Sequence, residues 1–278
     1  MNSESVSPEN LQLIILPGWG GSHETWVDFV ALAKPHFQDV VVIDLPCFGD
    51  EPCPKDVWGV EEYANFAKKR IDSLRHSEGP KGLEESREKQ RDLSTLDSLR
   101  SSSIRDDIIL LGHSFGGAVA TQLVVTNPDI ASKLILSGAA VIRPKNYLRR
   151  CIFGTMAKIG KLLITILPSQ KLKNLAKKVL YQVADSPDFS KTNGTKRDIF
   201  KKIIRQDLQH LLPSISIPTC VIQGTDDTYV PFRHGKRIAE GIRSASFVVI
   251  EKGRHGLHLK KNADAMLSAI LEFCTTSS

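Results

Sequence analysis

Residues 108–117, IILLGHSFGG, carry the pattern that decides the fold. The four apolar residues predict a buried strand, and helical apolar spacing follows from Phe115 to Asn127, where Pro128 ends it. Between the two, Ser114 is the centre of a Gly-x-Ser-x-Gly motif. A serine on such a strand-to-helix turn has strained backbone and displays its hydroxyl at the carboxyl edge of a sheet. Ser114 is therefore a candidate nucleophile in an α/β protein.

The same alternation continues on both sides of this stretch. Short apolar runs predict strands at 12–16, 40–44, 108–112, 133–137, 219–223 and 247–250, and helical spacing predicts helices at 25–33, 60–75, 115–127, 232–242 and 259–273. Most of the strand runs are apolar throughout, as in strands that helices cover on both faces. The sequence therefore predicts an α/β fold with an open, mainly parallel sheet flanked by helices.

The composition excludes several classes of protein. With 278 residues, 41% hydrophobic and 24% charged, the chain is neither disordered nor fibrous. No apolar run approaches the ~20 residues of a membrane span, and the first residues, MNSESVSPEN, do not resemble a signal peptide. The five cysteines, Cys47, Cys53, Cys151, Cys220 and Cys274, are scattered and lack metal-site spacing. We therefore expect reduced cysteines and a cytoplasmic location.

Two segments interrupt the alternation. Residues 76–107 are polar, Ser-rich and mixed in charge, which predicts a flexible insertion. Residues 141–212 carry helical apolar spacing at 156–167 and 172–181, which predicts an inserted helical lid. We expect residues 1–140 and 213–278 to form the two parts of one core, with the lid between them.

The predicted lid is strongly basic. Residues 143–205 hold sixteen Lys or Arg against three Asp, a net charge of +13, which leaves −7 for the rest of a chain whose total is +6. Three explanations stay open: a solvated lid face, attraction of an anionic or carrier-bound acyl substrate, and weak contact with an anionic membrane surface. The lid lacks the interleaved aromatic residues of nucleic-acid sites, so we expect no nucleic-acid partner.

A serine is a weak nucleophile near neutral pH and needs a base. His255, in GRHGLH directly after the last predicted strand, comes from a loop that opens on the same sheet edge as Ser114. His258 is the one rival, and we expect it to pack beside that loop. The other histidines are expected in solvent: His23, His36, His76, His210 and His234.

A buried carboxylate would fix the tautomer of the histidine and stabilise the imidazolium. Two adjacent candidates, Asp226 and Asp227, follow the penultimate predicted strand in GTDDTYVP. Glycines in LPGWGGS at 16–22 allow backbone N–H groups to turn toward an oxyanion, and the amides of Trp19 and Phe115 are our candidates. The glycine spacing there does not fit a dinucleotide-binding loop.

Over nearly its whole length the chain resembles the α/β-hydrolase fold superfamily, in its serine-nucleophile, short-lid carboxylesterase-like branch. The matching segments are LPGWGGSHETW, VVIDLPCFGDEP, GHSFGG, DLQHLLPSISIPTCVIQGTDDTYVP and KGRHGLHL. The resemblance implies Asp227 as the acid, because the family's aspartate lies three residues after the glycine and four before the proline. It also supports His255 as base and the Trp19 and Phe115 amides as the oxyanion hole.

The chain departs from the family at a few positions. Pro17 stands where many relatives have histidine, and Cys47 replaces a glycine, which leaves a reactive thiol as an alternative role. The insertion at 76–107 is longer than expected. We also expect Gly18, His113 and Val230 to line the substrate site.

A serine at position 114 excludes the aspartate-dependent dehalogenase and epoxide hydrolase branches. The resemblance implies hydrolysis of small-molecule carboxylic esters or thioesters through an acyl-enzyme, with no cofactor and no metal. C–C bond or amide hydrolysis by the same residues is an alternative. A non-catalytic binding module on the same scaffold is the alternative of another class.

Overall fold

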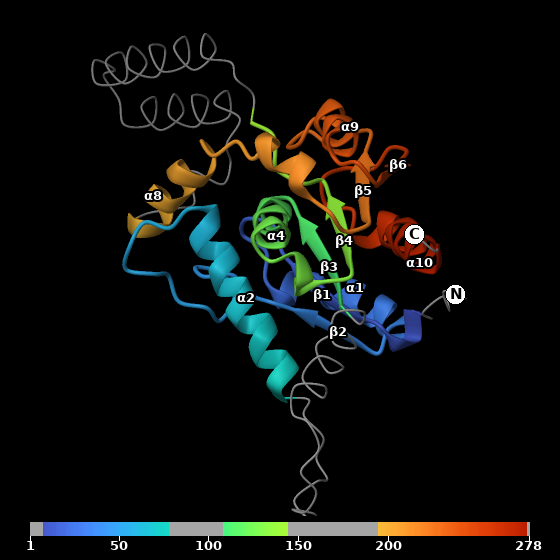
Figure 1. Cartoon of the computed structure of the whole chain (residues 1–278), viewed down its shortest axis with the longest axis horizontal. Helices are drawn as coiled ribbons and strands as arrows, with labels where there is room; N and C mark the ends of the chain where they lie inside the picture. The colour runs from blue at the N-terminus through green and yellow to red at the C-terminus, as the bar shows by residue number, and fades with distance from the viewer. Residues whose placement is uncertain (1–7, 78–107, 144–193, 277–278) are drawn as a thin grey trace, which may run out of the picture.

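The computed structural model describes residues 8–77, 108–143 and 194–276. Six strands form one sheet in the order β2-β1-β3-β4-β5-β6, and every neighbouring pair is parallel (Figure 1). Their bounds are β1 Gln12–Leu16, β2 Asp39–Val42, β3 Ile108–His113, β4 Lys133–Ser137, β5 Thr219–Gly224 and β6 Ala245–Ile250. The predicted open parallel α/β sheet is confirmed.

Helices cover both faces of the sheet. They are α1 His23–Ala33, α2 Val60–Ser77, α4 Phe115–Thr126, α8 Gly194–Ile203, α9 Phe232–Gly241 and α10 Ala263–Thr275. Short 3-10 helices lie at η1 Pro8–Asn10, η2 Lys34–His36, η3 Pro128–Ile130, η4 Gln209–Ser214 and η5 Lys260–Asn262. None of the described helices combines the length and apolar character needed to cross a bilayer.

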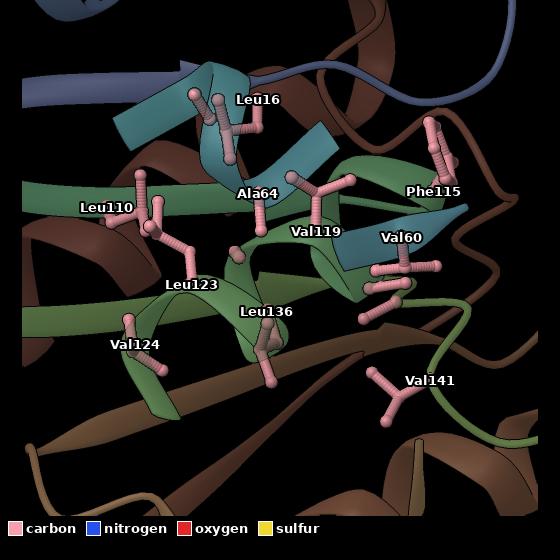
Figure 2. Packing of buried hydrophobic residues seen from close by; sticks show 14 of the residues in the cluster. Leu16, Val60, Ala64, Leu110, Phe115, Val119, Leu123, Val124, Leu136 and Val141 are labelled. Carbon is pink, nitrogen blue, oxygen red and sulfur yellow. The ribbon is translucent and has the colours of Figure 1, made fainter. Parts of the chain in front are cut away.

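Alternate residues of the central strands point into two separate hydrophobic cores. On β1, Ile14 and Leu16 point into the cluster under α2, α4 and α9, whereas Leu13 and Ile15 point into the cluster under α1 and α10. This follows from the two-residue period of a strand, and burial on both faces explains why these strands are apolar throughout. Figure 2 shows part of the first cluster, in which Ala64 of α2 lies beside Val119 of α4, and Leu123 of α4 lies beside Leu110 of β3.

Two element ends differ from the prediction. The second strand ends at Val42 rather than at residue 44, and the Asp44 carboxylate just beyond it accepts a hydrogen bond from the His23 N–H at 2.6 Å, at the start of α1. The last helix begins at Ala263, after the 3-10 turn, rather than at residue 259. Residues 78–107 of the predicted insertion and 144–193 of the predicted lid lie outside the described residues.

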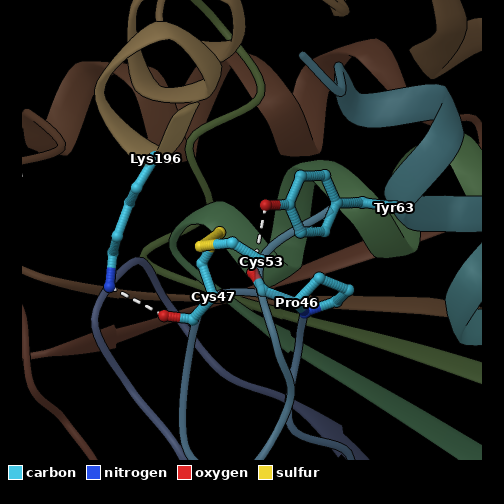
Figure 3. The surroundings of a disulfide bond; sticks show 5 residues. All are labelled: Pro46, Cys47, Cys53, Tyr63 and Lys196. Atoms are coloured by element: carbon cyan, nitrogen blue, oxygen red, sulfur yellow. Dashed lines mark hydrogen bonds between the residues drawn. A yellow bond between two sulfur atoms is a disulfide. The ribbon is translucent and has the colours of Figure 1, made fainter. Parts of the chain in front are cut away.

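The loop after β2 contains a disulfide between Cys47 and Cys53, whose Cα atoms are 4.1 Å apart. The expectation of reduced cysteines is wrong for this pair, because the loop folds back and brings them together, and Cys47 has no free thiol. Cys47 has a φ of 78°, in the left-handed region that favours glycine. Figure 3 shows that the loop is tied on both sides: the Tyr63 hydroxyl donates to the Pro46 carbonyl at 3.1 Å, and Lys196 Nζ donates to the Cys47 carbonyl at 2.7 Å.

The strand order fixes where a site can form. The chain moves from β1 outward to β2 and then crosses to β3 on the other side of β1. Connections on either side of such a switch point leave the sheet in opposite directions, which opens a crevice at the carboxyl ends of the strands. The loop after β1 and the turn after β3 therefore meet at one edge.

Candidate active site

Ser114 lies on the tight turn between β3 and α4. Its φ of 53° and ψ of −114° lie outside the regions that residues with a Cβ normally occupy. Gly116 is required beside it, because a Cβ there would overlap the carbonyl oxygen of Leu16 on β1. The turn holds the Ser114 side chain partly exposed at the carboxyl edge of the sheet.

The His255 imidazole lies between Ser114 and Asp227. Nε2 is 2.8 Å from Ser114 Oγ, and Nδ1 is 2.8 Å from Asp227 Oδ2. A neutral ring with its proton on Nδ1 donates to the carboxylate and accepts the hydroxyl proton of Ser114 at Nε2. The Asp227 side chain is 1% exposed and that of His255 is 18% exposed, so the acid is shielded while the base is accessible.

Asp227 accepts four hydrogen bonds. Oδ1 accepts the N–H groups of Tyr229 at 2.9 Å and Val230 at 2.8 Å, and Oδ2 accepts Gln223 Nε2 at 3.1 Å in addition to His255. These four hydrogen bonds fix the orientation of the carboxylate. Asp226 is exposed and does not contact His255, so of the two adjacent aspartates only Asp227 lies in the site.

Gln223 is a further residue of the site that was not predicted from the sequence. Its side chain is completely buried at the end of β5, and it contacts the carboxylate that His255 contacts. The one signal in the sequence is a long amide side chain at the end of an apolar strand, directly before the loop of the acid.

A second layer of histidines lies beneath the site. His258 stacks on Trp26 with ring centroids 3.9 Å apart, so it packs beside the loop as expected. Burial lowers the pKa of His258 to about 4, with a smaller contribution from His255. His113 is buried against His255, and its pKa is held well below the usual range by burial and by the two neighbouring histidines. Both rings are therefore neutral near pH 7.

One other histidine, His234, differs from the expectation of exposure to solvent. His234 is 5% exposed, because the first turn of α9 packs against the end of β5, and burial lowers its pKa. His23 is half-exposed, and its Nδ1 is 2.6 Å from Asp44 Oδ2. The prediction of a solvated side chain is wrong for His234.

The loop after β1 approaches the nucleophile closely. A Cβ on Gly18 would lie 3.0 Å from the Cβ of Ser114. Phe115 is the first residue of α4, where N–H groups have no acceptor within the helix, and no described residue accepts a hydrogen bond from the Trp19 N–H. The two amides proposed for an oxyanion hole thus come from the two segments that flank Ser114.

The three residues expected to line the substrate site are placed differently from one another. Gly18 lies against Ser114, as described above. His113 is 5% exposed and its Nδ1 lies 2.9 Å from the Ser137 carbonyl, while Val230 is 7% exposed and binds Asp227 through its N–H. The close contacts of His113 and Val230 are thus with the site residues, and substrate contact by the three stays a prediction.

Aromatic rings gather around Trp19. Its ring lies 4.8 Å from Phe48, 5.7 Å from Phe115 and 4.9 Å from Phe200 on α8. Lys196 Nζ lies 4.2 Å from the centroid of the Phe48 ring. One side of the site is therefore an apolar wall, with the Lys196 cation at its margin.

One group within the described ranges has the geometry to hold a metal ion. Ligand atoms of His23, Asp44 and Asp50 lie within 4.8 Å of one another. The Asp44 carboxylate already accepts the backbone N–H groups of His23 and Asp50, at 2.6 Å and 3.4 Å, and contacts the His23 ring. This group thus joins the start of α1 to the loop after β2.

Comparisons with known proteins agree with this fold. In curated proteins, the chain is 26% identical over 180 residues to a 2-hydroxy-6-oxononadienedioate/2-hydroxy-6-oxononatrienedioate hydrolase of Pseudomonas, a match that covers 59% of this chain and 62% of that protein. The chain thus spans less than two thirds of that relative. It is 21% identical to the pimeloyl-[acyl-carrier protein] methyl ester esterase of Neisseria meningitidis, over 94% of this chain and 93% of the esterase.

Solved structures extend the likeness to the whole fold. The enol-lactonase of Burkholderia xenovorans superimposes with a TM-score of 0.63 at 20% identity, over 96% of this chain and 92% of the lactonase. A family model described as serine aminopeptidase, S33, matches residues 76–262, well over half of the chain. The chain therefore belongs to the serine aminopeptidase S33 family of α/β hydrolases.

Proposed function

We propose that the chain hydrolyses carboxylic esters or thioesters through an acyl-enzyme formed on Ser114. The observation that supports this proposal is the continuous line of hydrogen bonds from Ser114 Oγ through His255 to Asp227. This arrangement can deprotonate a hydroxyl at neutral pH without a metal or cofactor.

The steps follow from the geometry. Ser114 Oγ attacks the acyl carbon while its proton passes to His255 Nε2, and Asp227 stabilises the imidazolium. The oxyanion of the tetrahedral intermediate is bound by the N–H groups of Trp19 and Phe115. His255 then gives the proton to the leaving alcohol or thiol. A water molecule, deprotonated by His255, releases the acid and restores the Ser114 hydroxyl.

The aromatic wall favours an acyl group with apolar surface. Trp19 and the rings around it lie directly beside the proposed oxyanion hole, where the acyl chain of a bound ester would extend. Residues 141–212 are proposed to form a lid over this side, and their net basic charge favours an anionic or carrier-bound ester. The described end of this segment, α8, contributes Phe200 to the wall.

Hydrolysis of a C–C bond or an amide is the alternative on the same residues. The Pseudomonas relative, by its name, acts on a dienedioate, but its match covers 59% of this chain. The methyl ester esterase matches 94% of the chain, which favours esters. A panel of p-nitrophenyl esters, acyl thioesters, anilides and a 2-hydroxy-6-oxo dienoate separates these classes by their relative kcat/KM.

The direct test is labelling with a fluorophosphonate, followed by peptide mass spectrometry. We expect the label on Ser114, and we expect Ser114→Ala to lose p-nitrophenyl butyrate hydrolysis by at least about 10³-fold while it keeps its thermal transition. A label on another residue would contradict the nucleophile assignment. Equal turnover by wild type and Ser114→Ala would favour the binding module instead.

We propose the cytoplasm as the compartment of this protein. The Cys47–Cys53 disulfide is an argument against it, because thiols in the cytosol are kept reduced. Alkylation of the protein in lysates of its native cells, before and after reduction, tests this location. Two further alkylated cysteines after reduction would contradict the cytoplasmic location.

A further inference from the structure

Gln223 uses both of its amide hydrogens on the loop that carries Asp227. Nε2 lies 3.1 Å from Asp227 Oδ2 and 3.0 Å from the Val230 carbonyl oxygen. The side chain is completely buried, and Gln223 is the second-last residue of β5, directly before that loop. A single amide thus joins the carboxylate to the backbone three residues later.

The orientation of this amide is fixed by its neighbours. Both groups in front of Nε2 are acceptors, so a rotated amide would bring Oε1 against two oxygens. Behind it, α9 approaches so closely that a Cβ on Gly235 would lie 2.7 Å from Gln223 Oε1. Oε1 is buried and has no hydrogen-bond partner among the described residues. An unsatisfied buried acceptor lowers the stability of the fold. A role for the Nε2 donor of Gln223 explains why an amide occupies this position despite that cost.

We propose that Gln223 is a positioning residue of the hydrolase, whose amide orients the Asp227 carboxylate and sets how strongly it binds the proton on His255 Nδ1. The inference rests on the proposed function, since it assigns Asp227 and His255 their catalytic roles. Gln223 and His255 both donate to the same atom, Asp227 Oδ2, so the amide acts on the oxygen that binds the imidazole. The N–H of Gln223 draws negative charge from this oxygen and weakens its hold on the imidazolium.

Removal of the amide therefore has a defined direction. Without the Gln223 donor, Asp227 Oδ2 carries more charge and stabilises the His255 imidazolium more, so the base becomes active at higher pH. The loop also loses the hydrogen bond to its Val230 carbonyl, so the Asp227 carboxylate is less well oriented. Among the residues that the structure describes, the other titratable groups around the pair are His113 on β3, His258 in the loop of the base, Tyr229 beside His255 and His234 on α9. The three histidines have lowered pKa values and stay neutral over the relevant range.

The test uses Gln223→Met, which keeps the length of the side chain and removes its donors. We expect kcat for p-nitrophenyl butyrate to fall about tenfold with little change in KM, and the acid limb of the kcat/KM profile to move up by about half a pH unit. Gln122→Met, a partly exposed change on α4, is the matched control and should leave both unchanged. A Gln223→Met profile that coincides with wild type would overturn the inference, because a purely structural role does not move this limb.

Gln223→Glu gives a second, independent signature. A carboxyl group at this position shares one proton with Asp227, and its neutral form still donates to Oδ2. We expect kcat/KM to rise with pH as in wild type while His255 loses its proton, and then to decline at higher pH, where wild type stays level, as the shared proton is lost. This variant is nearly isosteric and keeps the inference testable if Gln223→Met does not fold. A profile that stays level at high pH, as in wild type, would overturn the inference.

A proton NMR measurement separates this inference from the proposed function. The His255 Nδ1 proton should give a downfield resonance in wild type that shifts in Gln223→Met, with no substrate present. A shifted resonance in a protein that no ester or fluorophosphonate engages would support the role of Gln223 and reject the proposed function. An unshifted resonance in an active esterase would reject the role of Gln223 and support the proposed function.

Discussion

His255 Nε2 lies 2.8 Å from Ser114 Oγ, although 141 residues separate the two in the chain. The parallel sheet produces this proximity, because the turn after β3 and the loop after β6 both leave at the carboxyl edge. Each group is held by local geometry, Ser114 by its strained turn and His255 by Asp227. The contact therefore needs no movement of the core to form.

Asp227→Asn tests the acid. The amide would offer a donor to His255 Nδ1 and favour the tautomer with its proton on Nε2, which cannot accept from Ser114. We expect kcat for p-nitrophenyl butyrate to fall about 10⁴-fold with the fold intact. Asp226→Asn is the matched control, since Asp226 is exposed one residue away, and it should keep nearly full activity. A larger loss in Asp226→Asn than in Asp227→Asn would reverse the assignment.

Ser114 and His255 could be located from the sequence because each follows a strand that is easily identified. A glycine-flanked serine after an apolar run, and a histidine after the last run, must meet at one edge in a parallel sheet. The choice between Asp226 and Asp227 needed either a family pattern or coordinates. Adjacent residues in a loop point in different directions, and only the fold decides which one is buried.

Gln223 and the Cys47–Cys53 bond could not be predicted, for different reasons. The role of Gln223 depends on the approach of α9 at Gly235, which places a helix behind the amide and leaves the acid loop in front. The disulfide depends on a left-handed residue at Cys47 that folds the loop back on itself. The sequence shows only two cysteines six positions apart, a spacing that many loops share.

The disulfide predicts a redox-dependent stability. Cys53→Ala releases a short closed loop, and we expect the free energy of unfolding to fall by about 2 kcal/mol. Dithiothreitol should lower the melting temperature of wild type and leave that of Cys53→Ala unchanged. Differential scanning fluorimetry with and without the reductant measures both. Equal effects of dithiothreitol on the two proteins would show that it acts elsewhere than on Cys47 and Cys53.

The charge of the predicted lid leads to a salt-dependent rate. Residues 143–205 carry a net charge of +13, so they should attract an anionic ester at low ionic strength and lose that attraction as salt screens it. We expect kcat/KM for a succinyl-type ester with a free carboxylate to fall severalfold between about 10 mM and 500 mM NaCl. A neutral ester of equal length is the control and should change little. Parallel salt curves for the two esters would reject this role of the lid.

The stacked His258 predicts how stability depends on pH. Its folded-state pKa is lowered to about 4 from an ordinary value of 6.5, mainly by burial, so between these values the unfolded chain binds more protons than the folded one. The contribution of His258 to the free energy of unfolding is therefore constant above pH 6.5 and decreases as the pH falls toward 4. His258→Phe keeps a ring on Trp26 and removes the titrating group together with the unpartnered Nδ1.

Urea unfolding of both proteins from pH 7.5 to pH 4 measures this term. We expect the free energy of unfolding of His258→Phe to increase relative to that of wild type as the pH falls below 6.5, by up to about 3 kcal/mol at pH 4. His234, whose lowered pKa does not depend on His258, is present in both proteins and cancels from the difference, whereas His113, whose pKa His258 helps to lower, adds a smaller second contribution. A difference that stays constant across this range would mean that His258 is protonated in the folded state as readily as in the unfolded chain, and that burial against Trp26 does not hold it neutral.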